Sequence, residues 1–451
     1  MQLYLFQQDL RIHDQPLLSH AMKQGSVIGL YIFHDAWYLE TYKGIQKKSN
    51  LVLNYLYESV KELSINLNTL NIPLIVRKGR YQDIIKDILD TYKIECIYYE
   101  KLPGTEEDQL YHFIKRLNIK SFHQEMKPLY KTIDLPFSIE ALPEIFTHFR
   151  KKIETTSIRF DIHDSLNSQA PVSIQTSFPE KKDLSIEHQT LQFQAGESNA
   201  LSHLHDYFFI HHYAKTYKET RNGMLRFEDS TKFSPYLAIG SLSVKTIMNT
   251  LSQYEKKVIK NDSTYWIYFE LLWRDYFYYV HKKHGNTIFS ECGLSRHVET
   301  TFNKAFIGAW MQGKTGFPLI DANIRQLVQT GYMSNRGRQN VANFFTKFLK
   351  QDWRIGAAFF ESYLIDYDVS SNTLNWLYNA GLGNDPRENR MFNYITQGER
   401  YDMDRCFVRT FLPELQHVPD HLVYKVSLFS DHERETYQLT SYPKPIKKYT
   451  P

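Results

Sequence analysis

The first 130 residues alternate short apolar runs with longer amphipathic stretches. The apolar runs occur at residues 3–6, 27–33, 74–76 and 94–98. Between them, residues 51–70 and 81–89 carry apolar side chains at the three- and four-residue spacing of a helix face. Strands that alternate with helices of this length are typical of βαβ units. The pattern therefore predicts a doubly wound parallel sheet, a fold whose ligands bind beyond the carboxyl ends of the strands.

The pattern changes after residue 130. Residues 155–195 are rich in Ser, Thr, Gln and acidic residues and show weak periodicity, which is typical of a connection between domains. Helical spacing then returns at residues 200–213, 264–281, 302–310, 324–330, 341–349 and 357–367. We expect an α/β antenna-type domain at 1–130, an interdomain connection at 131–196, an all-α catalytic domain at 197–430 and a tail at 431–451. The Pro- and Lys-rich end at 443–451 is expected to be frayed.

Composition adds one unusual feature, a high content of aromatic residues. The 451 residues include 29 Phe, 32 Tyr and 6 Trp, or 15% aromatic side chains. Aromatic rings fill protein cores, and they also stack on bases or on a flavin. Composition leaves both interpretations open. The net charge of +4 is too close to balance to indicate a nucleic-acid partner by itself.

The cysteines and the N-terminal residues indicate in which cellular compartment the protein is expected. Cys96, Cys292 and Cys406 lack C-x-x-C spacing, which argues against a disulfide framework and favours a reducing compartment. Asp9 and Arg11 interrupt the only early apolar run, so the N-terminus does not resemble a signal peptide. No apolar run reaches the length of a membrane span. We expect a cytoplasmic monomer without a membrane partner.

Two motif matches are better explained without a ligand. Residues 308–315 fit the phosphate-loop expression, but the preceding residues have helical spacing and Gly316-Phe317-Pro318 follows at once, so we expect a helix end and a turn. His211 and His212 are adjacent and would point about 100° apart on a helix. No cluster of Cys or carboxylate residues completes a metal site there, so we expect no metal.

Two groups of polar residues are candidates for a binding site. Glu270, Trp273 and Arg274 share one helix face, where they could bind a planar ligand. An ion pair beside a core Trp explains the same pattern, and these residues alone favour that interpretation. Asp366 and Asp368 lie in an apolar stretch, where carboxylates are costly to bury without partners. The polar segment 333–340 could supply those partners.

Several segments together resemble one family in the right order. They are residues 220–223 (TRNG), 232–240 (KFSPYLAIG), 270–275 (ELLWRD), 315–323 (TGFPLIDAN), 335–340 (NRGRQN) and 375–378 (NWLY), with 9–14 (DLRIHD) near the N-terminus. They resemble the photolyase/cryptochrome family, and specifically its DASH branch. Directly before the segment 9–14, this chain has Gln7-Gln8 where the family usually has Arg-Asn. The resemblance covers nearly the whole chain.

The resemblance implies FAD bound in the helical domain. Hydroxyl groups and backbone N–H groups near a helix start suit a pyrophosphate. The matched positions on the phosphate and ribose side are Tyr217, Ser230, Thr231, Lys232, Phe233 and Ser234. The other matched FAD positions are Arg274, Asn335, Arg338, Asp366, Asp368 and Asn372, of which Arg338 and Asp366 match an ion pair beside the flavin ring and Asp368 a ribose contact.

The resemblance also implies a substrate, a cyclobutane pyrimidine dimer in DNA, split by an electron from photoexcited reduced flavin. The matched lesion positions are Glu270, Trp273, Asn335, Arg336, Gln339 and Tyr378. Asn372 matches the residue that faces flavin N5, where a neutral amide suits an anionic reduced flavin. Duplex-repairing relatives have Met and Trp at the positions of Gln339 and Tyr378, so we expect a preference for single-stranded DNA. The alternative is a blue-light photoreceptor that binds nucleic acid or a partner without repair.

Two further expectations concern light capture and electron supply. The branch typically carries a 5,10-methenyltetrahydrofolate antenna, for which residues 146–154 and the carboxylates of Glu106 and Glu154 are the matched candidates. The family reduces its flavin through three Trp residues. Trp376 and Trp353 match the first two, whereas Thr300 stands near the third position. We expect a Tyr to replace the missing Trp.

Overall fold

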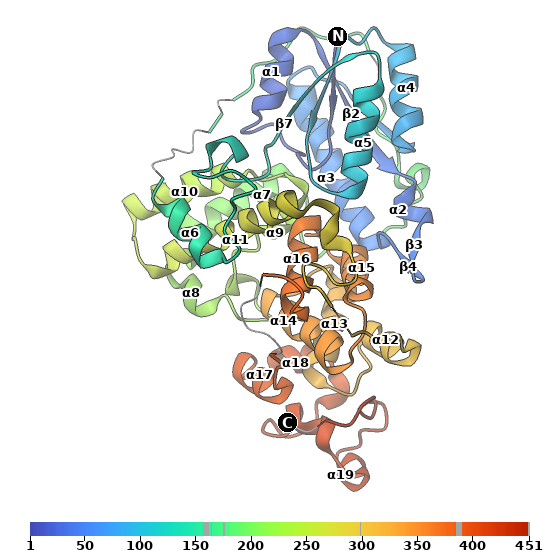
Figure 1. The fold of residues 1–451 in the computed structure, drawn as a ribbon, viewed down its shortest axis with the longest axis vertical. Coiled ribbons are helices and arrows are strands. Elements are labelled where there is room, and N and C mark those ends of the chain that lie inside the picture. The colour runs from blue at the N-terminus through green and yellow to red at the C-terminus, as the bar shows by residue number, and fades with distance from the viewer. Residues whose placement is uncertain (157–161, 164, 175, 298, 385–389, 450–451) are drawn as a thin grey trace. The chain divides into compact units, whose positions relative to one another are not determined.

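The computed structural model describes residues 1–156, 162–163, 165–174, 176–297, 299–384 and 390–449. The chain forms two compact units, each made of separate chain segments (Figure 1). Unit 1 comprises Met1–Lys218, Lys232–Asn286 and Ile365–Ser371. Unit 2 comprises Glu219–Thr231, Thr287–Leu364 and Asn372–Pro451. Unit 1 thus joins the α/β region to part of the helical region, a division that differs from the domain boundaries expected from the sequence.

Unit 1 contains the predicted parallel sheet. Its strands are β1 (Gln2–Leu5), β2 (Val27–His34), β5 (Leu74–Gly79), β6 (Cys96–Glu100) and β7 (Lys120–Gln124). They lie in the order β5-β2-β1-β6-β7, and every neighbouring pair is parallel. The predicted doubly wound sheet is therefore confirmed. The sequence pattern missed β7 because this edge strand is mostly polar and only partly buried.

Helices flank this sheet (Figure 1). They are α1 (Pro16–Gln24), α3 (Asn50–Thr69), α4 (Tyr81–Thr91) and α5 (Thr105–Arg116). Alternate strand residues such as Ile28, Leu30 and Ile32 form one core with apolar residues of α4 and α5. On the opposite side of β2, a Cβ at Gly29 would lie 2.9 Å from Leu74 Cδ1, so this position must stay small.

A short strand pair and further helices complete unit 1. The shorter elements are α2 (Ala36–Leu39) and the two-stranded pair β3 (Thr41–Tyr42) and β4 (Ile45–Gln46). The other helices are α6 (Phe146–Glu154), α7 (Glu197–His205), α9 (Ser234–Ile239), α10 (Val244–Lys257) and α11 (Asp262–His284), and α8 (Tyr217–Thr220) crosses into unit 2. The 23-residue helix α11 begins at an Asn261 cap, whose side chain accepts a hydrogen bond from Thr264 N. This helix carries the segment 270–275.

Unit 2 is helical. Its helices are α12 (Lys304–Met311), α13 (Pro318–Thr330), α14 (Asn335–Asn343), α15 (Trp353–Tyr363), α16 (Val369–Ala380), α17 (Tyr394–Tyr401), α18 (Cys406–Phe411) and α19 (Asp431–Thr436), of which α16 begins in unit 1. A π-helical turn, Phe344–Phe348, continues α14. The all-α character predicted for the C-terminal region is confirmed.

The C-terminal segment is ordered against unit 2, so the expectation of a frayed end is wrong for the residues up to 449. Tyr442 donates a hydrogen bond to buried Asp321, 2.7 Å away. Tyr449 is buried, and its ring packs against Phe317 and Phe348. Aromatic side chains in this segment supply apolar area that the Pro and Lys content did not reveal.

The phosphate-loop match at 308–315 is a helix end, as expected. Helix α12 ends at Met311, Gly313 takes a φ of 60°, and Thr315 N donates to Asp321. Within the described ranges, no group of three or more His, Cys, Asp or Glu residues could hold a metal ion. No described helix is long and apolar enough to cross a bilayer.

Candidate functional site

In unit 1, α11 presents Glu270 and Trp273 as half-buried side chains. Glu270 Oε1 accepts a hydrogen bond from Trp266 Nε1 at 3.2 Å, one turn earlier on the same helix. The indole of Trp273 stacks on the ring of Phe146 in α6, with a centroid distance of 3.8 Å and an interplanar angle of 12°. These contacts hold a carboxylate and an indole on one helix face.

Arg274, on the same helix, holds a loop of unit 1. Its Nη1 donates to the carbonyl oxygen of Lys127 at 2.7 Å, and it lies 3.6 Å from Asp275 Oδ1. Asp275 is fully buried and accepts hydrogen bonds from Leu129 N and Tyr130 N at 3.0 and 3.1 Å. Burial raises the pKa of Asp275 to about 6, although Arg274 and the two N–H groups oppose the rise. The Arg274–Asp275 pair therefore fixes the loop that carries Lys127.

The raised pKa of Asp275 predicts a pH-dependent stability. In the unfolded chain the pKa of this carboxyl is about 3.9. Between about pH 4 and pH 6, Asp275 is therefore protonated in the folded protein but ionised in the unfolded chain. Asp275 therefore contributes stability that is present below about pH 4 and is lost as the pH rises through about 6. An Asp275→Asn variant should be less stable than the wild type, because its Nδ2 meets an N–H donor, but the gap should narrow by about 1.4 kcal/mol per pH unit across this window.

Urea unfolding of both proteins at several pH values from 4 to 7 measures that gap. A gap that stays constant or widens with pH would contradict the prediction.

The loop carries Lys127 to a buried partner. Lys127 Nζ lies 2.5 Å from Asp368 Oδ2, and the two side chains are 8% and 13% exposed. Asp368 Oδ1 accepts from Ser371 N at 2.7 Å, so Asp368 caps the start of α16 rather than lying within the helix. Burial opposes ionisation here, but Lys127 and Arg274 outweigh it and hold the pKa of Asp368 well below its usual range. Asp368 is therefore a fixed carboxylate.

Sequence reasoning missed Lys127. It lies in a loop without a motif, and only its tertiary partner distinguishes it from other Lys residues. That the segment 333–340 supplies partners to Asp366 and Asp368 stays a prediction. Within unit 1, Asp368 pairs with Lys127, and Asp366 accepts a hydrogen bond from Ser234 Oγ at 2.6 Å.

Three of the predicted phosphate-side residues, Lys232, Phe233 and Ser234, lie at the start of α9. Lys232 is buried and takes a φ of 50°, a left-handed conformation that costs a non-Gly residue about 1–3 kcal/mol. Ser234 and Pro235 begin the helix. At its end, Gly240 has a φ of 70°, and a Cβ there would lie 1.9 Å from the carbonyl oxygen of Gln8. The segment 232–240 is thus bent at its start and packed against the segment 9–14 at its end.

In unit 2, Arg336 in the first turn of α14 is held by two amides. Its Nη2 donates to Asn222 Oδ1 at 2.9 Å and its Nη1 to Gln339 Oε1 at 2.8 Å. Its guanidinium lies 4.5 Å from the ring centroid of Tyr401. Burial, together with the charges of Arg221, Arg400 and Arg390, lowers the pKa of Arg336. This part of unit 2 therefore concentrates positive charge.

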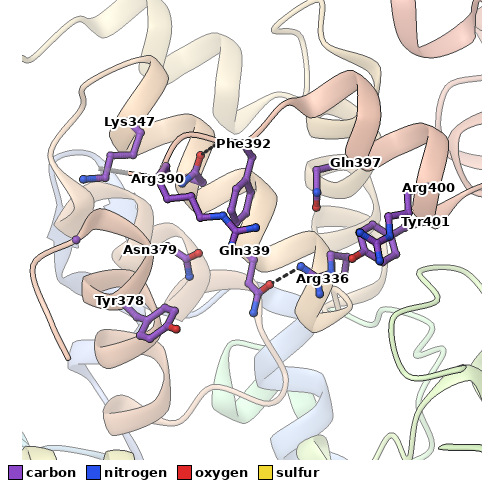
Figure 2. Close-up of a pocket in the computed structure, with 12 residues that line it drawn as sticks. Arg336, Gln339, Lys347, Tyr378, Asn379, Arg390, Phe392, Gln397, Arg400 and Tyr401 are labelled. Carbon is purple, nitrogen blue, oxygen red and sulfur yellow. Dashed lines mark hydrogen bonds between the residues drawn. The ribbon is translucent and has the colours of Figure 1, made fainter. Parts of the chain in front are cut away.

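A cavity of about 270 Å³ opens among these residues (Figure 2). Its lining is Arg336, Gln339, Asn343, Lys347, Tyr378, Asn379, Gly381, Arg390, Phe392, Gln397, Arg400 and Tyr401. The set contains four cations, several amides and three aromatic rings, and it contains no carboxylate. Such a lining suits an anion attached to planar rings. Sequence reasoning named Arg336, Gln339 and Tyr378; the remaining cations lie in segments without a recognisable motif.

Helix α16 brings Asn372 and Trp376 into unit 2. Asn372 Nδ2 donates to the carbonyl oxygen of Ala357 at 3.1 Å. The Trp376 indole is 1% exposed and packs edge-on against Phe360 and Trp310, at centroid distances of 5.0 and 6.1 Å. A Cβ at Gly356 would lie 2.1 Å from Trp376 Cη2, so only glycine leaves room for this ring. Asn372 and Trp376 are therefore held in fixed positions.

The position of the missing third Trp lies beside Trp353. Trp353 is 2% exposed, and its Nε1 donates to the carbonyl oxygen of Glu291 at 2.9 Å. Thr300 Oγ1 donates to the carboxylate of the same Glu291 at 2.8 Å. The electron-transfer role of Trp353, and that of a Tyr in place of the missing Trp, stay predictions.

The two antenna candidates lie on different helices. Glu106, in the first turn of α5, pairs with Lys47. Glu154, at the end of α6, accepts a hydrogen bond from Tyr265 Oη at 2.6 Å. The structure thus gives Glu154 a contact with α11, and the antenna role of both residues stays a prediction.

Each unit holds one part of the predicted site. Unit 1 holds Tyr217, Lys232, Phe233, Ser234, Glu270, Trp273, Arg274, Asp366 and Asp368. Unit 2 holds Ser230, Thr231, Asn335, Arg336, Arg338, Gln339, Trp353, Asn372, Trp376 and Tyr378.

Comparison with known proteins matches the N-terminal region and the helical region to two family models. Residues 2–170 match the family model described as DNA photolyase. Residues 266–450 match the model described as the FAD binding domain of DNA photolyase. The two matches define a flavoprotein of the photolyase type.

Individual relatives narrow the class. Cryptochrome DASH of Gloeobacter violaceus is 39% identical, over 98% of this chain and 92% of that protein. Cryptochrome DASH of Xenopus laevis is 40% identical, over 92% of this chain and 83% of that protein. The crystal structure of the Synechocystis cryptochrome has a TM-score of 0.92 at 38% identity and covers 99% of this chain and 96% of its own. The chain belongs to the photolyase/cryptochrome family, in its cryptochrome DASH branch.

Proposed function

We propose that this protein repairs cyclobutane pyrimidine dimers with light, preferentially in single-stranded DNA, using reduced FAD. The main support for this proposal is the cavity of unit 2, because its cations, amides and aromatic rings suit a strand of nucleic acid. The photolyase and FAD-binding matches support the reaction class. The chemistry supplied by bound FAD is the transfer of one electron to the dimer under illumination and its return after the ring has split.

The residues of the chain would bind the flavin and the lesion. Buried Lys232, the hydroxyl groups of Ser230 and Thr231 and the backbone N–H of Ser234 at the start of α9 suit a pyrophosphate, and the fixed carboxylate of Asp368 suits a ribose hydroxyl. These donors and acceptors fit FAD. Asn372 Nδ2 donates one of its two hydrogens to the carbonyl oxygen of Ala357, which leaves the second N–H and the acceptor Oδ1 for a ligand. An acceptor suits the N–H that a reduced flavin carries at N5.

Each unit contributes its own candidates for lesion recognition: a carboxylate and an indole in unit 1, and polar residues of the cavity in unit 2. Glu270 would accept from the N–H edge of a pyrimidine, and Trp273 would pack against the dimer. Gln339 and Tyr378 line the cavity with smaller, more polar groups than Met and Trp would provide. Such a wall holds an extrahelical dimer less tightly, and extrusion costs least from single-stranded DNA. Single-stranded substrate is therefore favoured.

The proposal is tested by illuminating the purified protein, loaded with reduced FAD, in the presence of oligonucleotides that carry one thymine dimer. We expect the dimer in the single strand to be split into two thymines, the dimer in the duplex to be split more slowly, and neither to be split in the dark. If neither substrate is restored under light, the repair function is wrong and the photoreceptor alternative takes its place.

A Glu270→Gln variant should weaken binding of the dimer. The change keeps the size of the side chain but replaces a charged acceptor, and a hydrogen bond to a charged group contributes about 1.5–3 kcal/mol, or about tenfold to a hundredfold in affinity. Titration in the dark with dimer-containing and undamaged single strands measures the effect. Undamaged DNA should bind the variant and the wild type equally; an unchanged affinity for the dimer would contradict the role of Glu270.

We also propose a 5,10-methenyltetrahydrofolate antenna. Glu106 and its partner Lys47 at the start of α5 are the supporting residues, since a carboxylate beside an ammonium group can bind a pterin ring by hydrogen bonds. Mass spectrometry of chromophores released from the purified protein would identify the folate or contradict its presence.

A further inference from the structure

Helix α6 lies within the segment that the sequence analysis assigned to an interdomain connection, yet it packs closely on α11. Phe146, at its start, stacks on Trp273 at 3.8 Å. Phe149, one turn later, packs against Tyr276 and Tyr279 at centroid distances of 5.1 and 5.9 Å. Two consecutive rings of α6 therefore contact two consecutive turns of α11, the helix of Glu270 and Trp273.

Phe146 is itself fixed in place. Its side chain is 5% exposed, and its ring meets those of Phe269 and Tyr276 edge to face, at 5.2 and 5.7 Å. Trp273, by contrast, is only half-buried. One face of the Trp273 indole is therefore covered by an immobile, nearly parallel ring, while part of the indole stays accessible.

Polar contacts fix α6 along α11 on both sides of this stack. Before it, Tyr276 Oη donates to the carbonyl oxygen of Glu144 at 2.5 Å. After it, Tyr265 Oη donates to Glu154 Oε1 at 2.6 Å and accepts from Arg150 Nη1 at 2.6 Å. These bonds tie the two ends of α6 to different turns of α11, so α6 cannot slide along α11 without breaking them.

We propose that Phe146 is a positioning residue for lesion recognition, which holds the Trp273 indole in its binding orientation before DNA arrives. The inference rests on the proposed function, in which Trp273 packs against the dimer. An aromatic side chain that is already immobile loses little conformational entropy when it meets a ligand. Without the Phe146 ring behind it, the Trp273 side chain would be mobile in the free protein and would lose conformational entropy when DNA binds. This entropy loss corresponds to about a threefold to tenfold weaker affinity.

The test is a titration in the dark, with a single-stranded oligonucleotide that carries one thymine dimer and with the same oligonucleotide undamaged. Phe146→Leu should bind the dimer about threefold to tenfold more weakly, with an unchanged affinity for undamaged DNA. Phe146→Tyr keeps the ring and should restore the preference for the dimer. Phe149→Leu, a matched change on the same helix without a contact to the Trp273 ring, should lower thermal stability but keep the ratio of the two affinities.

A double-mutant cycle with Trp273→Phe completes the test. If Phe146 acts through the indole, Phe146→Leu should reduce dimer affinity much less in the Trp273→Phe background than in the wild type. Equal losses in both backgrounds, or an unchanged preference in Phe146→Leu, would overturn the inference while leaving the proposed function intact. A wild-type protein without any preference for the dimer would instead overturn the proposed function, and this inference with it.

Discussion

Replacing Lys127 with Met should lower the free energy of unfolding by about 3–5 kcal/mol, because it leaves a buried carboxylate without its partner. The Nζ of Lys127 lies 2.5 Å from Asp368 Oδ2, and both side chains are almost fully buried. Lys127 is also one of the two cations that keep Asp368 ionised against the effect of burial. Without it the pKa of Asp368 should rise, and the amount of FAD that copurifies should fall because the proposed ribose acceptor loses its fixed position.

Two further variants make this prediction specific. In Lys127→Met/Asp368→Asn, both charges are absent, so most of the lost stability should return, while FAD content should stay low because the carboxylate is missing. Lys182→Met is a matched control, since Lys182 forms an ion pair with Glu180 in which both side chains are more than two-thirds exposed. Exposed pairs contribute about 0–1 kcal/mol, so the control should unfold like the wild type.

Chemical denaturation and the flavin absorbance of the purified proteins give the two readouts. Equal stability of Lys127→Met and the wild type would show that the pair contributes nothing. A double variant no more stable than Lys127→Met would show that the loss comes from packing rather than from the unpaired charge.

Trp376→Phe should abolish light-driven reduction of oxidised FAD in the presence of an external reductant. Trp376 is 1% exposed on α16, one turn after Asn372, and is enclosed by Phe360, Trp310 and Gly356. The substitution keeps an aromatic ring in this space, but benzene is far harder to oxidise than indole. An electron can then no longer leave the side chain that is proposed to lie next to the flavin, so the flavin should stay oxidised under light.

Phe360→Leu is the matched control for packing around Trp376. It removes a ring that meets Trp376 at 5.0 Å and leaves the indole in place. We expect this variant to lose about 1 kcal/mol or more of stability through imperfect repacking and to photoreduce its flavin. Absorbance spectra recorded during illumination follow the reduction. Normal photoreduction in Trp376→Phe would rule out its assigned role, and a loss in both variants would assign the effect to packing.

Periodicity and motifs in the chain predicted the architecture well. Apolar runs of three to seven residues separated by helical stretches predicted the parallel sheet, since βαβ units bury their strands on both faces. The polar edge strand β7 was not predicted, because a partly buried strand does not need a run of apolar residues. The Pro- and Lys-rich C-terminus was wrongly expected to be frayed, because composition does not show that Tyr442 and Tyr449 pack inside unit 2.

Part of the candidate site could be predicted from the sequence. Glu270, Trp273, Asn372 and Trp376 fall in segments that resemble a family, so they could be named before any contact was known. Lys127 and Phe146 could not, because a loop Lys and a Phe at a helix start are ordinary in sequence and gain a role only through Asp368 and Trp273.

The sequence by itself determined the class of protein, a parallel α/β domain joined to a helical FAD-binding domain of the cryptochrome DASH branch, and the residue types of its site. Those properties follow from local periodicity and short motifs, which are written along the chain. Only the tertiary structure decided which side chains hold the site residues in place: Lys127 beside Asp368, Phe146 behind Trp273, and four cations around one cavity. Each of these contacts joins residues far apart in sequence, and their energies depend on burial and mutual distance, which only folding sets.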